Sequence, residues 1–548
     1  MAIRAIEHDK SARAERVDQD QTGGDRRAQH PAMDPLIESL RDPARYPHPA
    51  AEVAVIETHI SWVLLAGRYA YKIKKPVRLP FLDFSTLELR RHFCEEELRL
   101  NRRTAPELYL RVVPIARAAS GPAIDAPGDP IEYAVQMKRF ARDALADTMA
   151  RGDALGPVRT DAIADALAAF HARAPRAGIA DGYGGPAEVA APALGNFEQL
   201  AELPGARAAA ARLERLRAWT ARQCAGLAGV FTARLAAGCV RECHGDLHLG
   251  NIAFIGERAV PFDCIEFDPA LRWIDVASEV AFVVMDLRAH GLQAQAWRLL
   301  NRWLERTGDY DSMPVLRLYL VYRAMVRAKV ACLRGAEVQF QSYLALAESL
   351  AVPRPRSLVL MHGVSGSGRT TLAEALLERF GAIRVRSDVE RKRLHGLEAR
   401  ARMATGPDQG IYDPAASGRT YGRLAGIARG ILEAGYPAIV DAAFLRLAER
   451  ERFRGLAREL EAQFLIVSST GPADLLRRRV ARRKAEGSDA SDAGESALAS
   501  QVATREPLTP KEEADAVTVE ALNQAALRRG ADALAARLAA GAESLALV

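Results

Sequence analysis

Residues 243–267 read CHGDLHLGNIAFIGERAVPFDCIEF, and no other segment of the chain gathers so many residues suited to phosphate chemistry. Asp246 is followed five residues later by Asn251, and Asp263 follows twelve residues after that. Phosphoryl transfer needs a carboxylate that accepts the proton of the attacking hydroxyl, and oxygen ligands for the magnesium that bridges the phosphates. The segment predicts both, with Asp263 on an apolar strand.

The loop aspartate and asparagine of protein kinases have this spacing, but here glycine precedes Asp246, so that HGD replaces HRD. The variant resembles the family of aminoglycoside phosphotransferases and choline kinases, over roughly residues 35–345. The resemblance implies that Asp246 is the catalytic base and that Asn251 and Asp263 are magnesium ligands. It also implies a structural role for Asp275 in the segment RWID.

The same family uses a strand lysine to hold the α and β phosphates and pairs it with a helix glutamate. The strand YKIKKPV offers Lys72 and Lys74 on one face, because side chains alternate along a strand. We expect Lys72 in this role, with Lys74 as the alternative. The helix CEEELRLNRR offers Glu97 as the partner and then Glu96. The sequence has no GxGxxG loop in the first hairpin, which contains only Gly67.

Two alternatives accompany this interpretation of the first motif. A kinase-like fold can bind a nucleotide without catalysis. The cluster of Cys239, Cys243, His244 and His248 is a candidate zinc site, but its compact spacing does not match the usual paired-ligand patterns. A kinase loop already explains His244, so zinc is not favoured.

A second motif, GVSGSGRT, lies between the apolar strand LVLMH and the amphipathic helix TLAEALLERF. This is the context of a P-loop, in which backbone N–H groups hold phosphate oxygens at a helix N-terminus. Arg369 stands where the usual pattern has lysine, and the hydroxyl of Thr370 is expected to reach magnesium. The nucleotide-binding residues are expected to be Gly363, Val364, Ser365, Gly366, Ser367, Gly368, Arg369, Thr370 and Thr371.

Residues 357–505, approximately, resemble the P-loop kinases of small molecules and polynucleotides, a group that includes gluconate kinase and the zeta toxins. The resemblance implies that Asp388, in RSDVERKRL, orients or deprotonates the acceptor hydroxyl, and that Asp441, in IVDAAF, supports magnesium. Arg479 and Arg483 lie four residues apart on one helix face and are expected to close over the phosphates. The alternative for this arginine run is a solvated helix or a patch that contacts RNA.

The order of the patterns predicts a mixed α/β and α+β protein. A bilobal protein-kinase-like domain at 33–351 is followed by a linker at 352–357, and a P-loop NTPase domain with a parallel sheet occupies 358–548. Residues 1–32 are polar and are expected to form a disordered tail. The tandem resembles bacterial proteins described as bifunctional aminoglycoside phosphotransferase and ATP-binding proteins.

The composition fits this division and narrows the class of protein. The chain has 548 residues, of which 26% are charged, and a formal net charge of +6, which suits phosphate-bearing ligands without requiring nucleic acid. Six scattered cysteines are not a disulfide framework and favour a reducing compartment. No run approaches the roughly 18 apolar residues that span a bilayer. We therefore expect a cytoplasmic protein without a membrane partner.

The sequence thus predicts a phosphotransferase that uses ATP and Mg²⁺ and acts on a hydroxyl of a small molecule. One alternative is a regulatory protein whose P-loop half binds ATP without efficient transfer. Another is a polynucleotide-type kinase in the C-terminal half, although a nucleic-acid partner is not favoured. A cationic acceptor would need an acidic cleft, for which Glu266, Asp268 and Glu279 are the nearby candidates.

Overall fold

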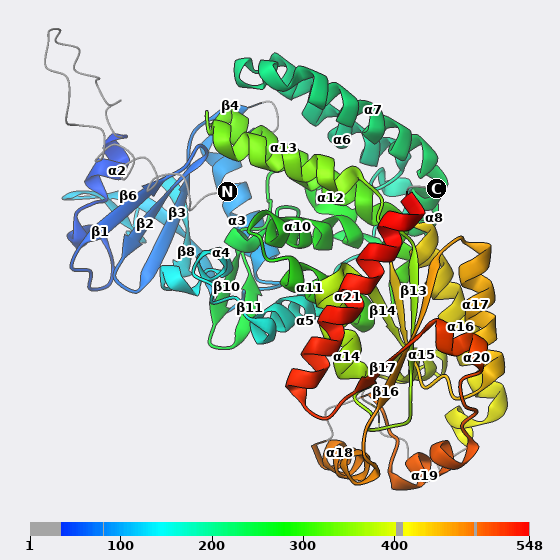
Figure 1. Cartoon of the computed structure of the whole chain (residues 1–548). Helices are drawn as coiled ribbons and strands as arrows, with labels where there is room; N and C mark the ends of the chain where they lie inside the picture. Colours follow the sequence, from blue (N-terminus) through cyan, green and yellow to red (C-terminus); the bar gives the residue numbers. More distant parts are fainter. Residues whose placement is uncertain (1–33, 80–81, 400, 402–408, 487–489, 547–548) are drawn as a thin grey trace, which may run out of the picture. The chain divides into compact units, whose positions relative to one another are not determined.

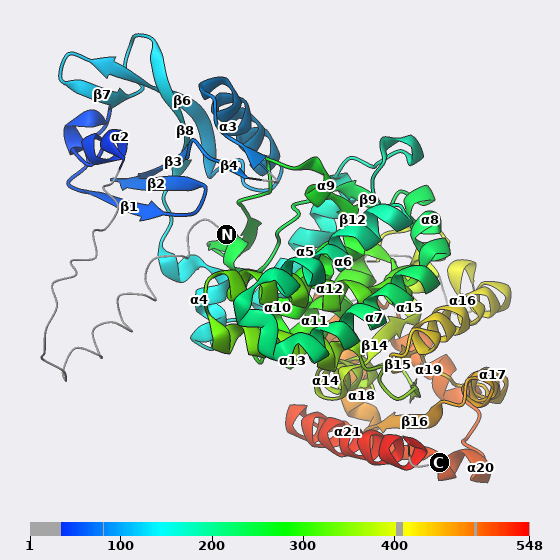
Figure 2. The same cartoon turned by 90° about the horizontal axis from the view of Figure 1, so that it is seen from above.

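The computed structural model describes residues 34–79, 82–399, 401, 409–486 and 490–546 (Figures 1 and 2). The tail predicted for residues 1–32 lies outside the described residues. The chain divides into two compact units, and the predicted domain boundaries stay predictions. The first unit comprises Met1–Leu155, Ala169–Gly184 and Arg234–Val283, and the second comprises Gly156–Ala168, Gly185–Ala233 and Val284–Val548.

The first unit is built on an antiparallel sheet with the strand order β1-β2-β3-β8-β6-β7. The strands are β1 (Val53–Glu57), β2 (Ser61–Ala66), β3 (Tyr69–Lys74), β6 (Tyr109–Ala118), β7 (Gly121–Ile124) and β8 (Pro130–Lys138). The predicted hairpin with a turn at Gly67 is confirmed, since β2 and β3 pair from Ala66 and Tyr69 onward. Helix α3 (Leu87–Asn101) contacts β6 and β8, so that one face of the sheet meets a helix.

Short elements complete the first unit. They are α2 (Pro35–Ser39), β4 (Arg78–Leu79), β5 (Leu82–Asp83), α4 (Ala146–Arg151), β9 (Val240–Glu242), β10 (Ile252–Ile255), β11 (Arg258–Pro261), α9 (Pro269–Arg272) and β12 (Trp273–Asp275). Strand β10 pairs with β11, and β9 pairs with β12. The loop between β9 and β10 carries the HGDLHLGN motif.

The expectation that Asp263 lies on a strand is wrong. Strand β11 ends at Pro261, and Asp263 adopts a left-handed backbone conformation with φ of 65°. Such a conformation cannot continue a strand, and aspartate is one of the few residues other than glycine that tolerate it. Asp263 therefore lies in the turn that follows the hairpin.

The second unit contains a parallel sheet with the strand order β14-β15-β13-β16-β17. The strands are β13 (Ser357–His362), β14 (Ile383–Arg386), β15 (Ala438–Asp441), β16 (Gln463–Thr470) and β17 (Ala516–Glu520). Helices α14 (Arg369–Leu376) and α21 (Gln524–Ala546, red in Figure 1) contact the sheet and each other, and α16 (Pro414–Glu433) and α17 (Leu447–Glu459) also contact it. The predicted fold class is confirmed, because parallel strands covered by helices form the P-loop half.

Further helices surround this sheet or precede it in the chain. They are α6 (Pro186–Glu202), α7 (Ala210–Gly226), α11 (Gln293–Thr307), α12 (Met313–Leu333), α13 (Glu337–Ala351), α15 (Ser387–Leu394), α18 (Ala473–Glu486), α19 (Glu495–Thr504) and α20 (Pro510–Ala514). Three helices contain residues of both units, namely α5 (Pro157–Arg173), α8 (Ala228–Ala236) and α10 (Val276–Ala289). Within the described ranges, no helix combines the length and the apolar character needed to cross a bilayer.

Helix α11 packs against strand β14, the edge strand of the parallel sheet. The buried side chain of Asn301 accepts a hydrogen bond from the backbone N–H of Arg384 at 2.6 Å and donates one to the carbonyl of Ala382 at 2.9 Å. An edge strand presents unpaired N–H and C=O groups. The amide of Asn301 satisfies one of each, as a neighbouring strand would.

Arg450 on α17 is a second buried polar anchor in this unit, and its side chain is fully buried. Its guanidinium donates to both carboxylate oxygens of Glu512, at 2.7 and 3.1 Å. It also donates to the carbonyl oxygens of Phe444 and Pro507, at 3.1 and 3.0 Å. The arginine therefore joins α17 to the segment around α20.

Replacement of Arg450 by Met should lower the free energy of unfolding of the second unit by about 3–5 kcal/mol, because the carboxylate of Glu512 would stay buried without its partner. Guanidinium unfolding followed by circular dichroism measures this change. The matched control is Arg429→Met, which removes an exposed pair with Glu459 at 2.6 Å and should change stability little. Equal effects of the two substitutions would contradict the assignment of Arg450 as an anchor.

Candidate functional site

The first site is centred on Lys72 of β3. Its ammonium donates to Oε1 of Glu97 at 2.8 Å and to Oδ1 of Asp263 at 2.6 Å. Burial lowers the pKa of Lys72, but Asp263 and Glu97 outweigh it and raise that pKa well above its usual value. Burial raises the pKa of Asp263, but the positive charge of Lys72 lowers this pKa by more. The pKa of Asp263 therefore lies well below its usual value. Lys72 and Asp263 are therefore both charged at neutral pH.

Lys74, the alternative to Lys72, has a different position. Its ammonium donates to Oε2 of Glu97 at 2.8 Å and also to Glu266, and its side chain is only 1% exposed. Glu97 thus bridges both lysines, but only Lys72 also contacts Asp263. The structure therefore brings together Lys72, Glu97 and Asp263. Glu96, the other glutamate considered, pairs with Arg99 at 2.6 Å instead.

The loop of the HGDLHLGN motif places Asp246 beside Asn251. The side-chain N–H₂ of Asn251 donates to the backbone carbonyl of Asp246 at 2.9 Å and lies 3.4 Å from its Oδ2. Because only the amide nitrogen can donate to a carbonyl, this contact fixes the orientation of the Asn251 amide. Nε2 of His248 lies 3.6 Å from Oδ2 of Asp246.

Backbone contacts bring this loop to the residue that precedes Asp263. The carbonyl of Asn251 accepts from the N–H of Phe262 at 2.9 Å. Nε2 of His244 lies 2.7 Å from the carbonyl of Phe262, so Nε2 must carry the proton. Burial lowers the pKa of His244, in keeping with a neutral imidazole that donates once. The three residues predicted around the metal are thus held by one continuous network.

Glu279 of α10, which the sequence suggests only as a candidate for an acidic acceptor cleft, supports the backbone of this loop. Its Oε1 accepts from the N–H groups of His244 at 2.6 Å and Gly245 at 3.0 Å, and its Oε2 lies 2.8 Å from Nε2 of His171. Gly245 has φ of 90°, and a Cβ there would come within 2.7 Å of the carbonyl of Leu271. The glycine of HGD is thus required by the backbone. Motif spacing could not reveal Glu279, because its partners are backbone groups.

Asp275 is a structural residue, as the resemblance implies. Its carboxylate accepts two hydrogen bonds from Arg234, at 2.6 and 2.8 Å, and one from the N–H of Ala277 at 2.8 Å. Both charged side chains are only 4% exposed. Asp275 therefore fixes the junction between β12 and α10.

The acidic residues considered as an acceptor cleft are committed to other contacts. Glu266 is buried against Lys74, and Glu279 is buried against the HGD loop. Asp268 caps α9 by accepting from the N–H of Ala270 at 2.9 Å. These carboxylates therefore do not form an acidic cleft for a cation.

The zinc alternative also receives no support from the geometry. Among the described residues, the set of His171, Cys243 and Glu279 comes close enough to share an ion. Glu279 already accepts hydrogen bonds through both oxygens, and burial raises the pKa of the Cys243 thiol well above its usual value. A thiol that keeps its proton is a poor metal ligand. The predicted alternative set of Cys239, Cys243, His244 and His248 does not assemble within the part of the chain that is described.

The second site follows β13, where the P-loop leads into α14. Gly366 has φ of 81°, and a Cβ there would come within 2.7 Å of the carbonyl of Leu476. Val364 packs in a small apolar cluster with Leu476 and Val480 of α18. The hydroxyl of Ser469 donates to the carbonyl of Ser367 at 2.6 Å. The loop is therefore fixed by packing as well as by backbone contacts.

Arg369, in the usual lysine position, donates from its guanidinium to the carbonyl of Gly363 at the start of the loop. Of the two predicted lid arginines, Arg479 lies 3.4 Å from the carbonyl of Gly366. Arg483 instead donates to the carbonyl of Ala493 at 3.1 Å. The structure thus brings Arg479, but not Arg483, into contact with the loop.

The two predicted acidic residues lie at the carboxyl end of the parallel sheet. Asp441 is the last residue of β15, opposite Met361 in register, and its Oδ2 lies 3.9 Å from Nε of Arg386. Asp388 is in the first turn of α15, directly after β14. Carboxyl ends of parallel strands are where ligands bind in open α/β sheets. Their predicted roles stay predictions.

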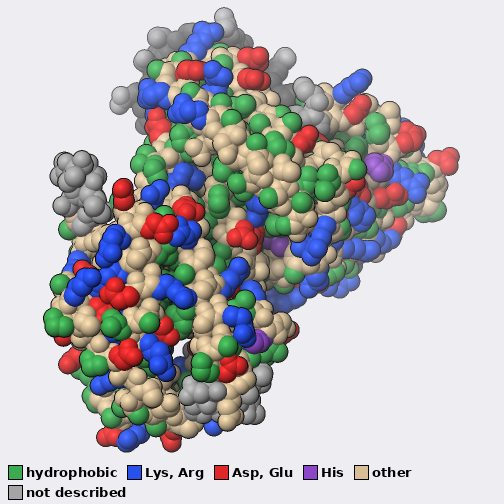
Figure 3. Space-filling model, turned by 90° about the vertical axis from the view of Figure 1, so that its right-hand side faces the viewer, with side chains coloured by type: hydrophobic (Ala, Val, Ile, Leu, Met, Phe, Trp, Pro, Cys, Tyr) green, Lys and Arg blue, Asp and Glu red, His purple; other side chains and the backbone are tan. Residues whose placement is uncertain are grey.

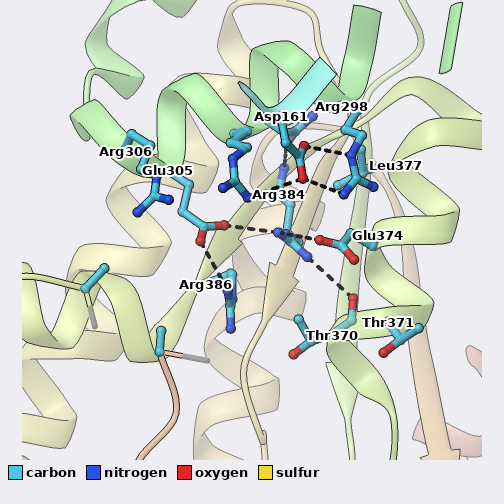
Figure 4. Close-up of a pocket in the computed structure, with 14 residues that line it drawn as sticks. Asp161, Arg298, Glu305, Arg306, Thr370, Thr371, Glu374, Leu377, Arg384 and Arg386 are labelled. Carbon is cyan, nitrogen blue, oxygen red and sulfur yellow. Dashed lines mark hydrogen bonds and ion pairs between the residues drawn. The ribbon is translucent and has the colours of Figure 1, made fainter. Parts of the chain in front are cut away.

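A pocket of about 360 Å³ lies against the start of α14 (Figure 4). Thr370 and Thr371 line it together with Arg384 and Arg386 of β14. Helix α11 and Asp161 of α5 supply another part of the wall. These helices precede the P-loop in the chain, and no local motif marks them as part of this site.

Comparison with known proteins agrees with this geometry. The family described as AAA domain matches residues 358–508. Similar solved structures include a gluconokinase from Sinorhizobium meliloti 1021, at 25% identity over 36% of this chain and 98% of that chain, with a TM-score of 0.26. A choline/ethanolamine kinase family protein from Mesorhizobium loti is 12% identical over 57% of this chain and 94% of that chain, with a TM-score of 0.35. The family match over residues 358–508 bears out the predicted resemblance of the P-loop half.

A full-length relative spans both halves. The uncharacterized protein Rv2004c of Mycobacterium tuberculosis is 30% identical over 471 residues, which cover 83% of this chain and 92% of the relative. With both motifs embedded in a match of this length, the chain belongs to the same family as this mycobacterial protein.

Proposed function

We propose that this protein transfers the γ-phosphate of ATP to a hydroxyl group of a small molecule at the site around Asp246. The observation that carries the proposal is the double contact of Lys72 with Glu97 and Asp263, at 2.8 and 2.6 Å. It joins the strand lysine, the helix glutamate and the aspartate after the loop in one charged cluster. This is the arrangement by which kinases position a nucleotide and its metal.

The residues present suit magnesium, which prefers oxygen ligands. The N–H₂ group of Asn251 is turned to the carbonyl of Asp246, so the oxygen of this amide is the atom left for a ligand. Asp263 contributes a carboxylate that Lys72 keeps ionised. When bound between them, magnesium would neutralise charge on the phosphates of ATP.

We propose that Asp246 accepts the proton of the acceptor hydroxyl. In the proposed step the hydroxyl oxygen bonds to the γ-phosphorus, and the bond from that phosphorus to the bridging oxygen of ADP breaks. The proton passes to the carboxylate of Asp246. Asn251 and His248 hold this carboxylate from one side, with contacts of 3.4 and 3.6 Å to Oδ2. Lys72 is proposed to hold the α and β phosphates.

A second candidate function concerns the P-loop half, which we propose binds ATP at Gly363–Thr370. The contact of Arg369 with the carbonyl of Gly363 favours a regulatory role, because it turns one N–H₂ group of the guanidinium toward the loop itself. Arginine is also longer and planar compared with the lysine that usually reaches the β and γ phosphates. Under this alternative the P-loop half binds ATP and controls transfer at the first site.

Action on polynucleotides is the least supported alternative. On the face shown in Figure 3, positive side chains of the described residues alternate with negative ones. Binding to a nucleic-acid backbone is stronger where positive charges cluster in a stripe. We therefore favour a small molecule as the acceptor.

Replacement of Asp246 by Asn should lower phosphate transfer from labelled ATP to a pooled set of hydroxyl metabolites by about 10²–10⁴-fold, because the proton acceptor is lost. The matched control is Asp125→Asn, an aspartate with φ of 58° that pairs with Arg111 outside the site. It should leave transfer unchanged. If Asp388→Asn abolishes transfer while Asp246→Asn does not, the chemistry belongs to the P-loop half and the proposal fails.

The support of the HGD loop by Glu279 gives a pH-dependent prediction. Burial raises the pKa of Glu279, but the contact with His171 and the neighbouring N–H groups outweigh it and lower the pKa from 4.5 to about 2. A carboxyl group with a lowered pKa in the folded state stabilises the protein above the unfolded pKa, and this stabilisation is lost as the pH falls toward about 2.

The difference in unfolding free energy between the parent protein and Glu279→Gln should therefore include about 3 kcal/mol above pH 5 that disappears toward pH 2. Urea unfolding at a series of pH values measures this difference. A difference that stays constant from pH 6 to pH 3 would show that the charge of Glu279 does not hold the loop.

A further inference from the structure

The pocket beside the P-loop is built from parts of the chain that lie far apart in sequence (Figure 4). Helix α11 provides Arg298, Arg302, Glu305 and Arg306, and α5 provides Asp161. The P-loop half provides Thr370, Thr371, Glu374, Arg384 and Arg386 among others. With about 360 Å³ of space, the pocket has the size needed for a molecule of the monosaccharide class.

The lining is rich in charged side chains of both signs. Among the described lining residues, five are arginines and three are carboxylates, namely Arg298, Arg302, Arg306, Arg384, Arg386, Asp161, Glu305 and Glu374. Two further carboxylates anchor the α11 arginines. Asp165 accepts from Nε and Nη2 of both Arg302 and Arg306, and Glu378 accepts from Arg298. Arg298 is also paired with both oxygens of Asp161, at 2.7 and 2.8 Å, and Nη1 of Arg302 lies 3.4 Å from the same carboxylate. Arg306 is held by Asp165 along one edge, and a guanidinium held in this way keeps its other N–H groups for a ligand.

The arginines of β14 link the pocket to the P-loop. Arg384 donates to Oε2 of Glu305 at 3.0 Å and lies 3.4 Å from the carbonyl of Thr370. Arg386 donates to Oε1 of Glu305 at 3.1 Å and lies 3.9 Å from Oδ2 of Asp441. Although burial raises the pKa of Glu305, these two arginines lower it, so the carboxylate stays charged. Glu305 therefore holds Arg384 beside Thr370 and Arg386 beside Asp441. Thr370 and Asp441 are the residues predicted to bind phosphate and magnesium.

A purely structural explanation is that these ion pairs only fasten α11 to the sheet. That task is already performed by Asn301, whose amide pairs with the backbone of β14. Ion pairs that serve packing alone are expected to close upon each other, because protein interiors leave few voids larger than water. Here the charged groups surround an open space next to Thr370. The geometry is that of a binding pocket for a polar ligand.

We propose that this pocket binds a small hydroxylated anion, a sugar or polyol that carries a phosphate or carboxylate group, and that α11 supplies its anion contacts. Arg306 and Arg302 bind the anionic oxygens, and the carboxylate of Glu374 accepts hydrogen bonds from hydroxyl groups. The walls of this pocket come from two parts of the chain. One part is the P-loop half, and the other consists of helices α5 and α11, which precede the linker. Delivery of phosphate to this ligand would rest on the proposed kinase function, whereas its binding does not.

Calorimetric titration of the full chain with glucose 6-phosphate, gluconate, inorganic phosphate and glucose tests the proposal. At least one of the two hydroxylated anions should bind about tenfold more tightly than glucose and than inorganic phosphate, and its affinity should fall between 50 and 300 mM NaCl. Arg302→Gln and Arg306→Gln should each weaken this binding about tenfold. Each variant keeps Asp165 paired through the other arginine, so both should fold, which thermal unfolding checks.

The matched control is Arg429→Gln, which removes an arginine that makes the same two-bond contact with a carboxylate, Glu459, outside the pocket. It should bind the anion as the parent does. Equal affinity of glucose and the anions, no binding by either anion, or unchanged binding by Arg302→Gln and Arg306→Gln would each overturn the proposal. Anion binding without phosphate transfer to that anion would leave this inference standing, because the inference concerns binding alone; loss of all transfer in the pooled assay with the parent protein would contradict the proposed function instead.

Discussion

The buried contact of Lys72 with Glu97 and Asp263 is the constraint on which the first site depends. A charge removed from water is costly unless it is paired, so the lysine of β3, the glutamate of α3 and the aspartate after β11 must arrive together. The second pair of Lys74 and Glu266 adds to this requirement, since Glu97 serves both lysines. These ion pairs thereby fix the positions of the sheet, the helix and the loop relative to one another. The geometry of the candidate site in this unit therefore depends on the pairing of its buried charges.

The local part of this arrangement could be predicted from the sequence. Asp246 and Asn251 are close in the chain, and the alternation of side chains in a strand narrows the choice to Lys72 or Lys74. The choice itself could not be made, because it depends on which ammonium meets Asp263. The position of Asp263 was predicted wrongly, since an apolar run does not reveal the left-handed residue that ends it. Glu279 was beyond prediction because it acts through backbone N–H groups.

The P-loop half shows the same division between local and distant information. The strand, the glycine loop and the helix were predicted because all three lie in one short stretch. The contact of Arg369 with Gly363 and the different partners of Arg479 and Arg483 depend on how the loop and α18 fold together. The wall supplied by α11 has no local signal at all. Periodicity identifies such a helix, but it does not say which strand the helix will meet.

The amide of Asn301 has a consequence for the modular character of this chain. By pairing with the N–H of Arg384 and the carbonyl of Ala382, it replaces part of what an additional strand would contribute at this edge of the parallel sheet. A fragment that began at the linker would leave that strand open along its length and free to recruit strands from other molecules. The sheet of the P-loop half therefore depends on α11, a helix that precedes the linker, to cover its outer edge.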